Sequence, residues 1–256
     1  SVKINYYNED AFINRGMTYF LLREYDKAIE DYTKALRINS MNAETLSSRG
    51  VAWFKKGKYN NSLKDFSKAI KTNPKLAKAY NSRGIIYFTF RKYDKAIADF
   101  NEAIRLNSNF AEAYNNRGNA YADKGEYDKA IDDYNEAISL DSNLSEAYGN
   151  RGCAYYFKSE HDKAIDDFNE AVRLNPNLAE AYGNRGNAYA KRGEYNKAID
   201  DFNEAIYLNP NLSEAYGNRG LIYAKRGEYN KAIDDFNEAI RLNPNEAKVY
   251  FNRGLI

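Results

Sequence analysis

The sequence predicts an all-α protein, a solenoid built from antiparallel helix pairs. Three observations predict it: one dipeptide recurs every 34 residues, the apolar residues between its copies follow a helical period, and glycine or proline separates the helical segments. The dipeptide Arg-Gly falls at Arg15-Gly16, Arg49-Gly50, Arg83-Gly84, Arg117-Gly118, Arg151-Gly152, Arg185-Gly186, Arg219-Gly220 and Arg253-Gly254. Because no insertion breaks the spacing, each interval is expected to be one structural unit.

Each unit contains two helical segments, as the unit around Gly186 illustrates. With this glycine counted as the eighth place of the unit, Tyr182 at the fourth place shares its helical face. In the second segment Phe202 lies between Ala198 and Ala205 at i, i+4 and i+7 spacing, which lets two helices approach closely around one ring. One such hairpin cannot bury both of its sides, so neighbouring units must stack.

Turn residues separate the segments. Gly193 suits the left-handed conformation that ends a helix, and Asn177 with Glu180 three residues later is predicted to form a capping box at a helix start. The thirty-second place, where proline ends the second helix, holds all four prolines of the chain, Pro74, Pro176, Pro210 and Pro244.

The pattern resembles that of the tetratricopeptide repeat family over nearly the whole chain. The residues that carry the resemblance in one unit are Tyr182, Gly186, Tyr189, Ala198, Phe202, Ala205 and Pro210. The resemblance implies a right-handed superhelical solenoid in which the first helix of each repeat lines the concave wall. One place departs from the family, because the seventh, commonly Leu, is Arg in every repeat. The predicted repeats are 9–42, 43–76, 77–110, 111–144, 145–178, 179–212, 213–246 and a partial repeat at 247–256.

The two ends of the chain fit a longer array. Val2, Ile4 and Asn5 match the twenty-eighth, thirtieth and thirty-first places of a repeat, so residues 1–8 are predicted to be the remnant of a preceding helix. The last repeat stops inside its first helix. We therefore expect a single solenoid over residues 1–256 that is a fragment of a longer array or of a larger protein.

The charge balance argues against nucleic-acid and membrane partners. A formal net charge of +2, from 38 basic and 36 acidic residues, gives no bias toward phosphate or anionic lipid. No run approaches the roughly 18 apolar residues of a membrane helix, and no secretory leader opens the chain. The single cysteine, Cys153, cannot form an internal disulfide, which fits a reducing compartment and a cytoplasmic location.

Asparagine recurs on the face that is expected to line the groove. An amide side chain both donates and accepts hydrogen bonds, so a ladder of them can hold the backbone of an extended peptide, as the resemblance to asparagine-lined members of the family also implies. The alternative is that these side chains cap helices, are solvated or bond to neighbouring helices. The predicted peptide-binding residues are Asn14, Asn116, Asn150, Asn184, Asn218 and Asn252 at the sixth place, and Asn119 and Asn187 at the ninth.

The seventh-place arginines are predicted to form ion pairs between the two helices of a repeat. Each full repeat also has aspartate at the twenty-third place, beside the buried stripe of the second helix, and partly buried charges must be paired. The alternative is an arginine row that binds an acidic ligand. The aspartates are Asp31, Asp65, Asp99, Asp133, Asp167, Asp201 and Asp235.

The groove is predicted to change along its length. The later repeats are roomier because of Gly149, Gly183 and Gly217 at the fifth place and Ala122, Ala190 and Ala224 at the twelfth. The earlier and middle part of the groove is predicted to be more apolar, and the alternative is that its large side chains pack between adjacent helices. These residues are Phe20, Leu21, Phe54, Phe88, Tyr156 and Phe157. The clamp that binds heat-shock protein tails in co-chaperones of this family is disfavoured, since no sixth place is basic and no fifth place is Lys.

The sequence offers few candidate catalytic residues. His161 stands where other repeats have Tyr, and nothing orients it as a base for Cys153. Since metal-ligand spacing and phosphate-binding glycine motifs are both missing, no catalytic residue, metal site or cofactor is predicted. The leading interpretation is a non-catalytic scaffold that holds an extended segment of a partner protein. Two alternatives are a regulatory or substrate-docking array of a larger enzyme, and a homo-oligomer that assembles through its repeat ends.

Overall fold

The protein is built from α-helices. The computed structural model describes residues 2–256, with side chains from residue 9 onward, and within that range there are 15 helices and no strand. The predicted all-α helical repeat array is therefore confirmed. None of the described helices combines the length and the hydrophobicity needed to span a bilayer.

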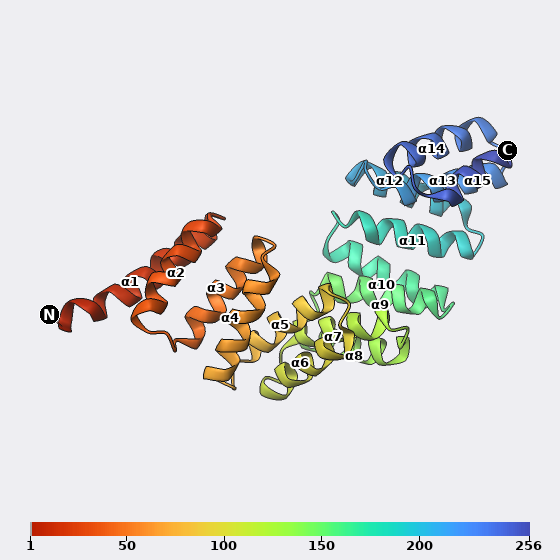
Figure 1. Ribbon diagram of the computed structural model, residues 1–256. Helices are drawn as coiled ribbons and strands as arrows, with labels where there is room; N and C mark the ends of the chain where they lie inside the picture. The colour runs from red at the N-terminus through yellow and green to blue at the C-terminus, as the bar shows by residue number, and fades with distance from the viewer. Residues whose placement is uncertain (1) are drawn as a thin grey trace. The chain divides into compact units, whose positions relative to one another are not determined.

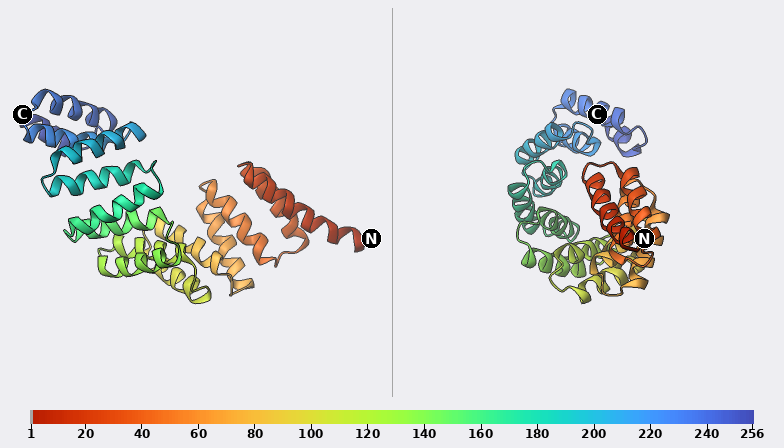
Figure 2. Two further views of the ribbon diagram at one scale, coloured as in Figure 1. Left: turned by 180° about the vertical axis from the view of Figure 1, so that it is seen from behind. Right: turned by 90° about the vertical axis from the view of Figure 1, so that its left-hand side faces the viewer.

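The chain divides into two compact units, residues 1–124 and residues 125–256. In each unit the helices stack in the order of the chain, and consecutive helices pack against each other (Figures 1 and 2). Unit 1 contains α1 (Val2–Leu21), α2 (Tyr25–Ile38), α3 (Ala43–Lys55), α4 (Tyr59–Thr72), α5 (Ala77–Thr89), α6 (Tyr93–Leu106) and α7 (Ala111–Asp123). Unit 2 contains α8 (Tyr127–Leu140), α9 (Ser145–Phe157), α10 (His161–Leu174), α11 (Ala179–Lys191), α12 (Tyr195–Leu208), α13 (Ser213–Lys225), α14 (Tyr229–Leu242) and α15 (Ala247–Gly254).

The backbone of α1 is continuous from Val2 to Leu21. The residues that suggested a preceding repeat, Val2, Ile4 and Asn5, lie before the first described side chain. Their assignment to a preceding helix stays a prediction, as does the treatment of the whole chain as one solenoid.

A glycine of the first helix lies against an aromatic ring of the second in six repeats, those of Gly16, Gly50, Gly84, Gly152, Gly186 and Gly220. Phe202 is fully buried, and a Cβ placed on Gly186 would come within 2.9 Å of the edge of this ring. At Gly84 the distance to Phe100 would be 2.6 Å. Since real Cβ atoms do not approach a ring so closely, only glycine allows this helix spacing.

A bidentate ion pair joins the same two helices beside the ring. Arg185 donates from Nε to Asp201 Oδ2 at 2.8 Å and from Nη2 to Oδ1 at 2.7 Å. The predicted Arg–Asp pairing is therefore confirmed for this repeat and for its equivalents. These are Arg15–Asp31, Arg49–Asp65, Arg83–Asp99, Arg151–Asp167 and Arg219–Asp235.

The arginine also reaches the preceding repeat. Arg185 Nη1 donates to Asn169 Oδ1 at 2.8 Å, and its guanidinium lies 5.3 Å from the centroid of the Tyr182 ring, one turn earlier in α11. With Nε, Nη1 and Nη2 all bonded within the protein, the alternative of an arginine row that binds an acidic ligand is not supported. The arginine instead fixes both the helix pair and its neighbour.

Burial limits what this ion pair adds to the free energy of unfolding. Burial raises the pKa of Asp167 although Arg151 opposes the shift, while the hydrogen bond from the guanidinium to Asp167 raises the pKa of Arg151. Desolvation of the carboxylate thus offsets part of the attraction. The pair therefore sets the register of the helices more than it stabilises them.

A second set of polar links joins successive repeats at the surface. Lys158 Nζ lies 2.5 Å from Asp128 Oδ1, and Arg226 Nη1 donates to Asn196 Oδ1 at 2.9 Å. At one junction an aromatic contact replaces the link, because Phe90 packs edge-on against Tyr59 with the ring centroids 5.6 Å apart. The junctions are therefore not equivalent.

Of the two turn features predicted around α11, one is confirmed and one is wrong. Gly193 has φ +78°, as predicted for a left-handed helix end. The capping box predicted at Asn177 and Glu180 is wrong, because the N-cap of α11 is Leu178 and no side chain caps it. Instead the backbone N–H of Asn177 donates to Asn175 Oδ1 at 3.2 Å, which forms an Asx turn in the loop.

The glycine–ring contact predicts the effect of adding one methyl group. We expect Gly186→Ala to lower the free energy of unfolding by about 1–3 kcal/mol, because the new Cβ forces Phe202 or the helix to shift. Urea unfolding followed by circular dichroism measures this change. The matched control is Gly183→Ala in the same helix, where a Cβ meets nothing closer than 3.7 Å and alanine should instead add up to about 1 kcal/mol. Equal effects of the two changes would contradict the close-packing account.

The ion pair predicts that its buried carboxylate cannot be neutralised without cost. Asp201→Asn should lower the free energy of unfolding by about 3 kcal/mol, because Arg185 loses its charged partner while staying largely covered. Asp200→Asn, one residue earlier on an exposed face, should change it by less than about 0.5 kcal/mol. Similar urea midpoints for the two variants would contradict a structural role for the pair.

Candidate functional site

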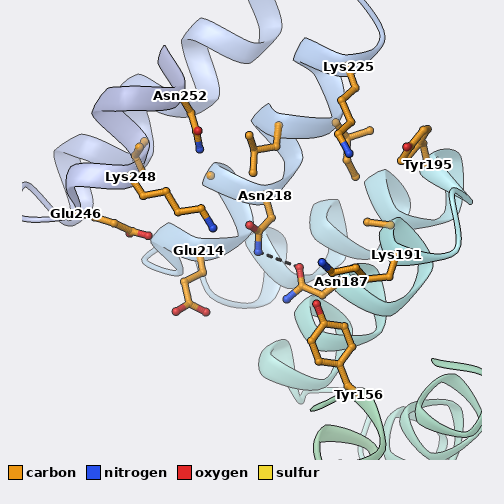
Figure 3. A pocket seen from close by; sticks show the side chains of 15 residues that line it. Tyr156, Asn187, Lys191, Tyr195, Glu214, Asn218, Lys225, Glu246, Lys248 and Asn252 are labelled. Atoms are coloured by element: carbon orange, nitrogen blue, oxygen red, sulfur yellow. Dashed lines mark hydrogen bonds between the residues drawn. The ribbon is translucent and has the colours of Figure 1, made fainter. Parts of the chain in front are cut away.

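The first helices of the repeats form an inner wall in unit 2. α9 contacts α11 and α11 contacts α13, whereas the second helices of successive repeats lie farther apart. This difference curves the unit toward the first helices, as the resemblance implies. The side chains on the exposed face of α11, α13 and α15 therefore face a common hollow (Figure 3).

A cavity of about 430 Å³ lies on this wall and is called the polar pocket below. Its size is in the range of small-ligand pockets. Gly217 and Ala190 are among its lining residues, as predicted for the roomier later repeats. The polar side chains that line it are Tyr156, Asn187, Lys191, Tyr195, Glu214, Asn218, Lys225, Glu246, Lys248 and Asn252.

Three of the predicted asparagines meet at the polar pocket. Asn218 Nδ2 donates to Asn187 Oδ1 at 2.8 Å, and Asn252 lines the same cavity from α15. Since Asn187 accepts with its oxygen, its own Nδ2 is directed away from Asn218 (Figure 3). Both side chains are half-buried, so part of each amide stays accessible.

Asn184 repeats this arrangement one helix earlier. Its Nδ2 lies 3.3 Å from Cys153 Sγ, so a sixth-place amide again donates to the ninth-place side chain of the preceding repeat. Asn184 also lines a smaller cavity of about 190 Å³ together with Asn187 and Asn218. The structure therefore brings Asn184, Asn187, Asn218 and Asn252 together along one stretch of the wall.

The other predicted asparagines are placed differently. Asn116 Nδ2 donates to Asn81 Oδ1 at 3.0 Å in unit 1, a contact with the fifth place of the preceding repeat. Asn14 is exposed, and its carbonyl accepts a bond from the Thr18 hydroxyl at 3.0 Å. Asn119 and Asn150 are half-buried and make interactions of their own. Bonding between neighbouring helices thus accounts for part of the asparagine pattern, and binding by all eight stays a prediction.

Unit 1 carries an apolar counterpart on its own inner wall. A cavity of about 240 Å³ is lined by Met17, Phe20 and Leu21 of α1, by Tyr32 of α2 and by Ser48 and Val51 of α3. Leu21 is 80% exposed. The apolar early part of the groove is therefore present at this cavity.

Several predicted groove aromatics pack within the wall instead. The Phe20, Phe54 and Phe88 rings at the twelfth place lie 5.4 to 5.8 Å from the tyrosine ring that begins the second helix of the same repeat. Phe157, at the thirteenth place, is 64% exposed and stacks on Tyr127 at 5.4 Å. Packing within the wall thus accounts for Phe54 and Phe88, whereas Phe20 and Tyr156, also at the twelfth place, line the two cavities. The thirteenth-place residues Leu21 and Phe157 are exposed.

Cys153 and His161, the two residues considered for catalysis, lie in environments that do not favour it. Burial raises the pKa of Cys153 to about 11, which keeps the thiol protonated and weakly nucleophilic at neutral pH. His161 packs against Tyr156 with the ring centroids 5.4 Å apart, and its buried Nδ1 has no hydrogen-bond partner among the described residues. Within residues 9–256, no group of His, Cys, Asp and Glu side chains has the arrangement of a metal site.

Sequence reasoning missed the lysines of the polar pocket. Lys191 and Lys225 stand at the thirteenth place and Lys248 at the second, both of which belong to the predicted groove stripe. The repeat register therefore places all three lysines on the groove face. Their neighbour Tyr156 has a pKa raised by burial, so its hydroxyl remains a donor.

The stacked helix pairs and the open inner wall define an α-helical repeat protein. The family model described as tetratricopeptide repeat matches residues 9–42, 111–144, 145–178, 179–212 and 213–246, and a second model of the same repeat matches 52–89 and 92–125. The chain belongs to the tetratricopeptide repeat family. Arrays of this family are protein–protein interaction scaffolds and are generally non-catalytic.

Solved structures of the same fold include three of different character. A chain of the APC/C hetero-tetramer Cut9–Hcn1 is 21% identical with a TM-score of 0.82 over 99% of this chain, which spans only 50% of that chain. YrrB, described as having an unusual peptide-binding site, is 25% identical with a TM-score of 0.59, covering 74% of this chain and 97% of its own. MamA is 30% identical with a TM-score of 0.57, covering 64% and 96%. No curated protein matches the sequence.

Proposed function

We propose that the chain is a non-catalytic scaffold that holds an extended segment of a partner protein along the inner wall of unit 2. The observation that carries this proposal is the polar pocket, where Asn187, Asn218 and Asn252 face one cavity from three successive first helices. We propose the other predicted asparagines as further binding residues: Asn184 adjoins the pocket and Asn150 lies on α9 in unit 2, while Asn14, Asn116 and Asn119 lie on first helices of unit 1.

The hydrogen bond between Asn218 and Asn187 supports this role. It fixes both amides, so little side-chain entropy is lost when a peptide binds. The Nδ2 of Asn187 and the Oδ1 of Asn218 remain for a peptide carbonyl and a peptide N–H, respectively. The pair therefore offers complementary groups to an extended backbone without reading its side chains.

The comparison with YrrB supports the same proposal. That protein is described as a tetratricopeptide repeat protein with a peptide-binding site, and nearly all of it aligns with this chain. A second candidate is a segment of a larger assembly or enzyme, which the match to half of the longer Cut9–Hcn1 chain favours. Both candidates place a protein partner on this array.

Removal of the two linked amides tests the proposal. A peptide selected from a displayed random library against the parent chain should bind Asn187→Ala/Asn218→Ala about tenfold more weakly, because two polar contacts to the backbone are lost. Fluorescence anisotropy with the labelled peptide measures the dissociation constant.

The matched control changes two exposed asparagines away from the wall. Asn211→Ala/Asn230→Ala should bind within about twofold of the parent, since neither residue lines the cavity. Circular dichroism verifies that both variants keep their helices. Selected peptides that bind all three chains equally would rule out the asparagine groove, and failure to select any peptide would count against the scaffold function itself.

A further inference from the structure

The unpaired positive charge of unit 2 collects at the polar pocket. Every residue from 125 to 256 is described, and 12 of the 16 basic residues in this range have a carboxylate oxygen within 4.0 Å. The four without one are Lys191, Lys225, Lys248 and Arg253. The three lysines all line the polar pocket. The charges left for an external partner are thus concentrated where the peptide is proposed to lie.

The fold does not require lysine at these positions. Lys191 and Lys225 end α11 and α13, and the same thirteenth place holds Leu21, Lys55, Thr89 and Asp123 in unit 1 and Phe157 in unit 2. Neither lysine makes an ion pair that would explain its presence. The fold thus gives no reason for lysine at these two positions, which favours a role in binding a ligand.

The groups around Lys191 form a cluster of hydrogen-bond donors. The Tyr156 hydroxyl points toward Lys191 and Asn187 in Figure 3, and the Nδ2 of Asn187 is directed away from Asn218. Lys225 stands over the Tyr195 ring, 5.7 Å from its centroid. Ammonium, amide and phenol donors converge here, which suits a carboxylate acceptor.

The opposite side of the pocket has mixed charge. Lys248 lies there with Glu214 and Glu246, on the other side of Asn218 from Lys191 and Lys225 (Figure 3). The two glutamates offset the attraction of Lys248 for an anion. The side of Lys191 and Lys225, at the C-terminal ends of α11 and α13, is therefore the one that favours negative charge.

We propose that Lys191 and Lys225, with Tyr156 and Asn187, bind aspartate or glutamate side chains of an acidic extended segment of the partner protein. This inference rests on the proposed peptide groove and names the chemistry of its partner. Two ammonium groups on successive helices suit carboxylates spaced along a strand better than one terminal carboxylate, since side chains of an extended segment that point to one side recur every second residue. The lysines thus provide sequence preference, while the asparagines hold the backbone.

Matched peptides and matched variants test this inference. The probes are acetylated and amidated peptides of about 12 residues, long enough to cross the wall at ~3.3 Å per residue, one with spaced Glu among Ser and Ala and one with Gln in place of Glu. The parent should bind the Glu peptide about tenfold more tightly by fluorescence anisotropy, with the preference shrinking at high salt. Lys191→Gln/Lys225→Gln should lose this preference.

The control variant is Lys197→Gln/Lys231→Gln, which makes the same charge change at corresponding places of α12 and α14. These lysines pair with Glu194 and Glu228 at 2.7 Å outside the pocket, so the preference should stay within about twofold of the parent value. A third probe carries Gln throughout and a free carboxyl terminus, and tight binding of this probe alone would overturn the side-chain assignment.

Two other results would also overturn the inference. One is equal binding of the Glu and Gln peptides to the parent, and the other is a preference that survives in Lys191→Gln/Lys225→Gln. A library-selected peptide that is released by Asn187→Ala/Asn218→Ala but ignores the lysine variant would leave the groove in place and remove only its acidic specificity. If neither Glu nor library-selected peptides bind the parent, the groove itself fails.

Discussion

The approach of a first-helix glycine to an aromatic ring on the second helix constrains the whole structure. No side chain can be added at Gly186 without meeting Phe202, and the residues that precede these two in the chain, Arg185 and Asp201, lock the same contact by two hydrogen bonds. Packing thus sets the distance between the helices, and the ion pair sets their register. Since the arginine also reaches the preceding repeat, one dipeptide determines both the hairpin and its stacking.

Because the Arg-Gly dipeptide determines the hairpin and its stacking, the residues of the inner wall can differ between repeats. Residues 183–206 and 217–240 are identical except at two places, where Asn187-Ala188 becomes Leu221-Ile222. The exchange matters at the wall, because Asn187 accepts the hydrogen bond from Asn218 whereas Leu221 cannot accept one from Asn252. Two otherwise equal repeats therefore present a linked amide pair at one junction and a single amide beside an apolar side chain at the next.

The sequence predicted the features that repeat and missed those that depend on neighbours. The Arg–Asp pairs followed from constant spacing on two helices, and the structure confirms them in six repeats. The capping box at Asn177 failed because the loop places Leu178 at the helix start and uses Asn175 for the turn. A short polar motif does not reveal which of several loop asparagines holds the turn.

The side-chain partners at the wall were also beyond sequence reasoning. The register placed Asn184 and Asn218 on the correct face, but their bonds to Cys153 and Asn187 depend on how closely successive first helices approach. The register places the lysines of the pocket on the groove face, but their lack of carboxylate partners is seen only in the three-dimensional structure. Periodicity therefore defines the scaffold, and three-dimensional contacts define what it offers to a partner.

The most direct test follows the side-chain amide signals of the asparagines by ¹⁵N NMR while a bound peptide is titrated in. The signals of Asn187 and Asn218 should shift, since both amides face the polar pocket. The signal of Asn203, which accepts a bond from Arg219 outside the pocket, should stay in place. Peptide binding with Asn187 and Asn218 unmoved would contradict the account of how this protein engages its partner.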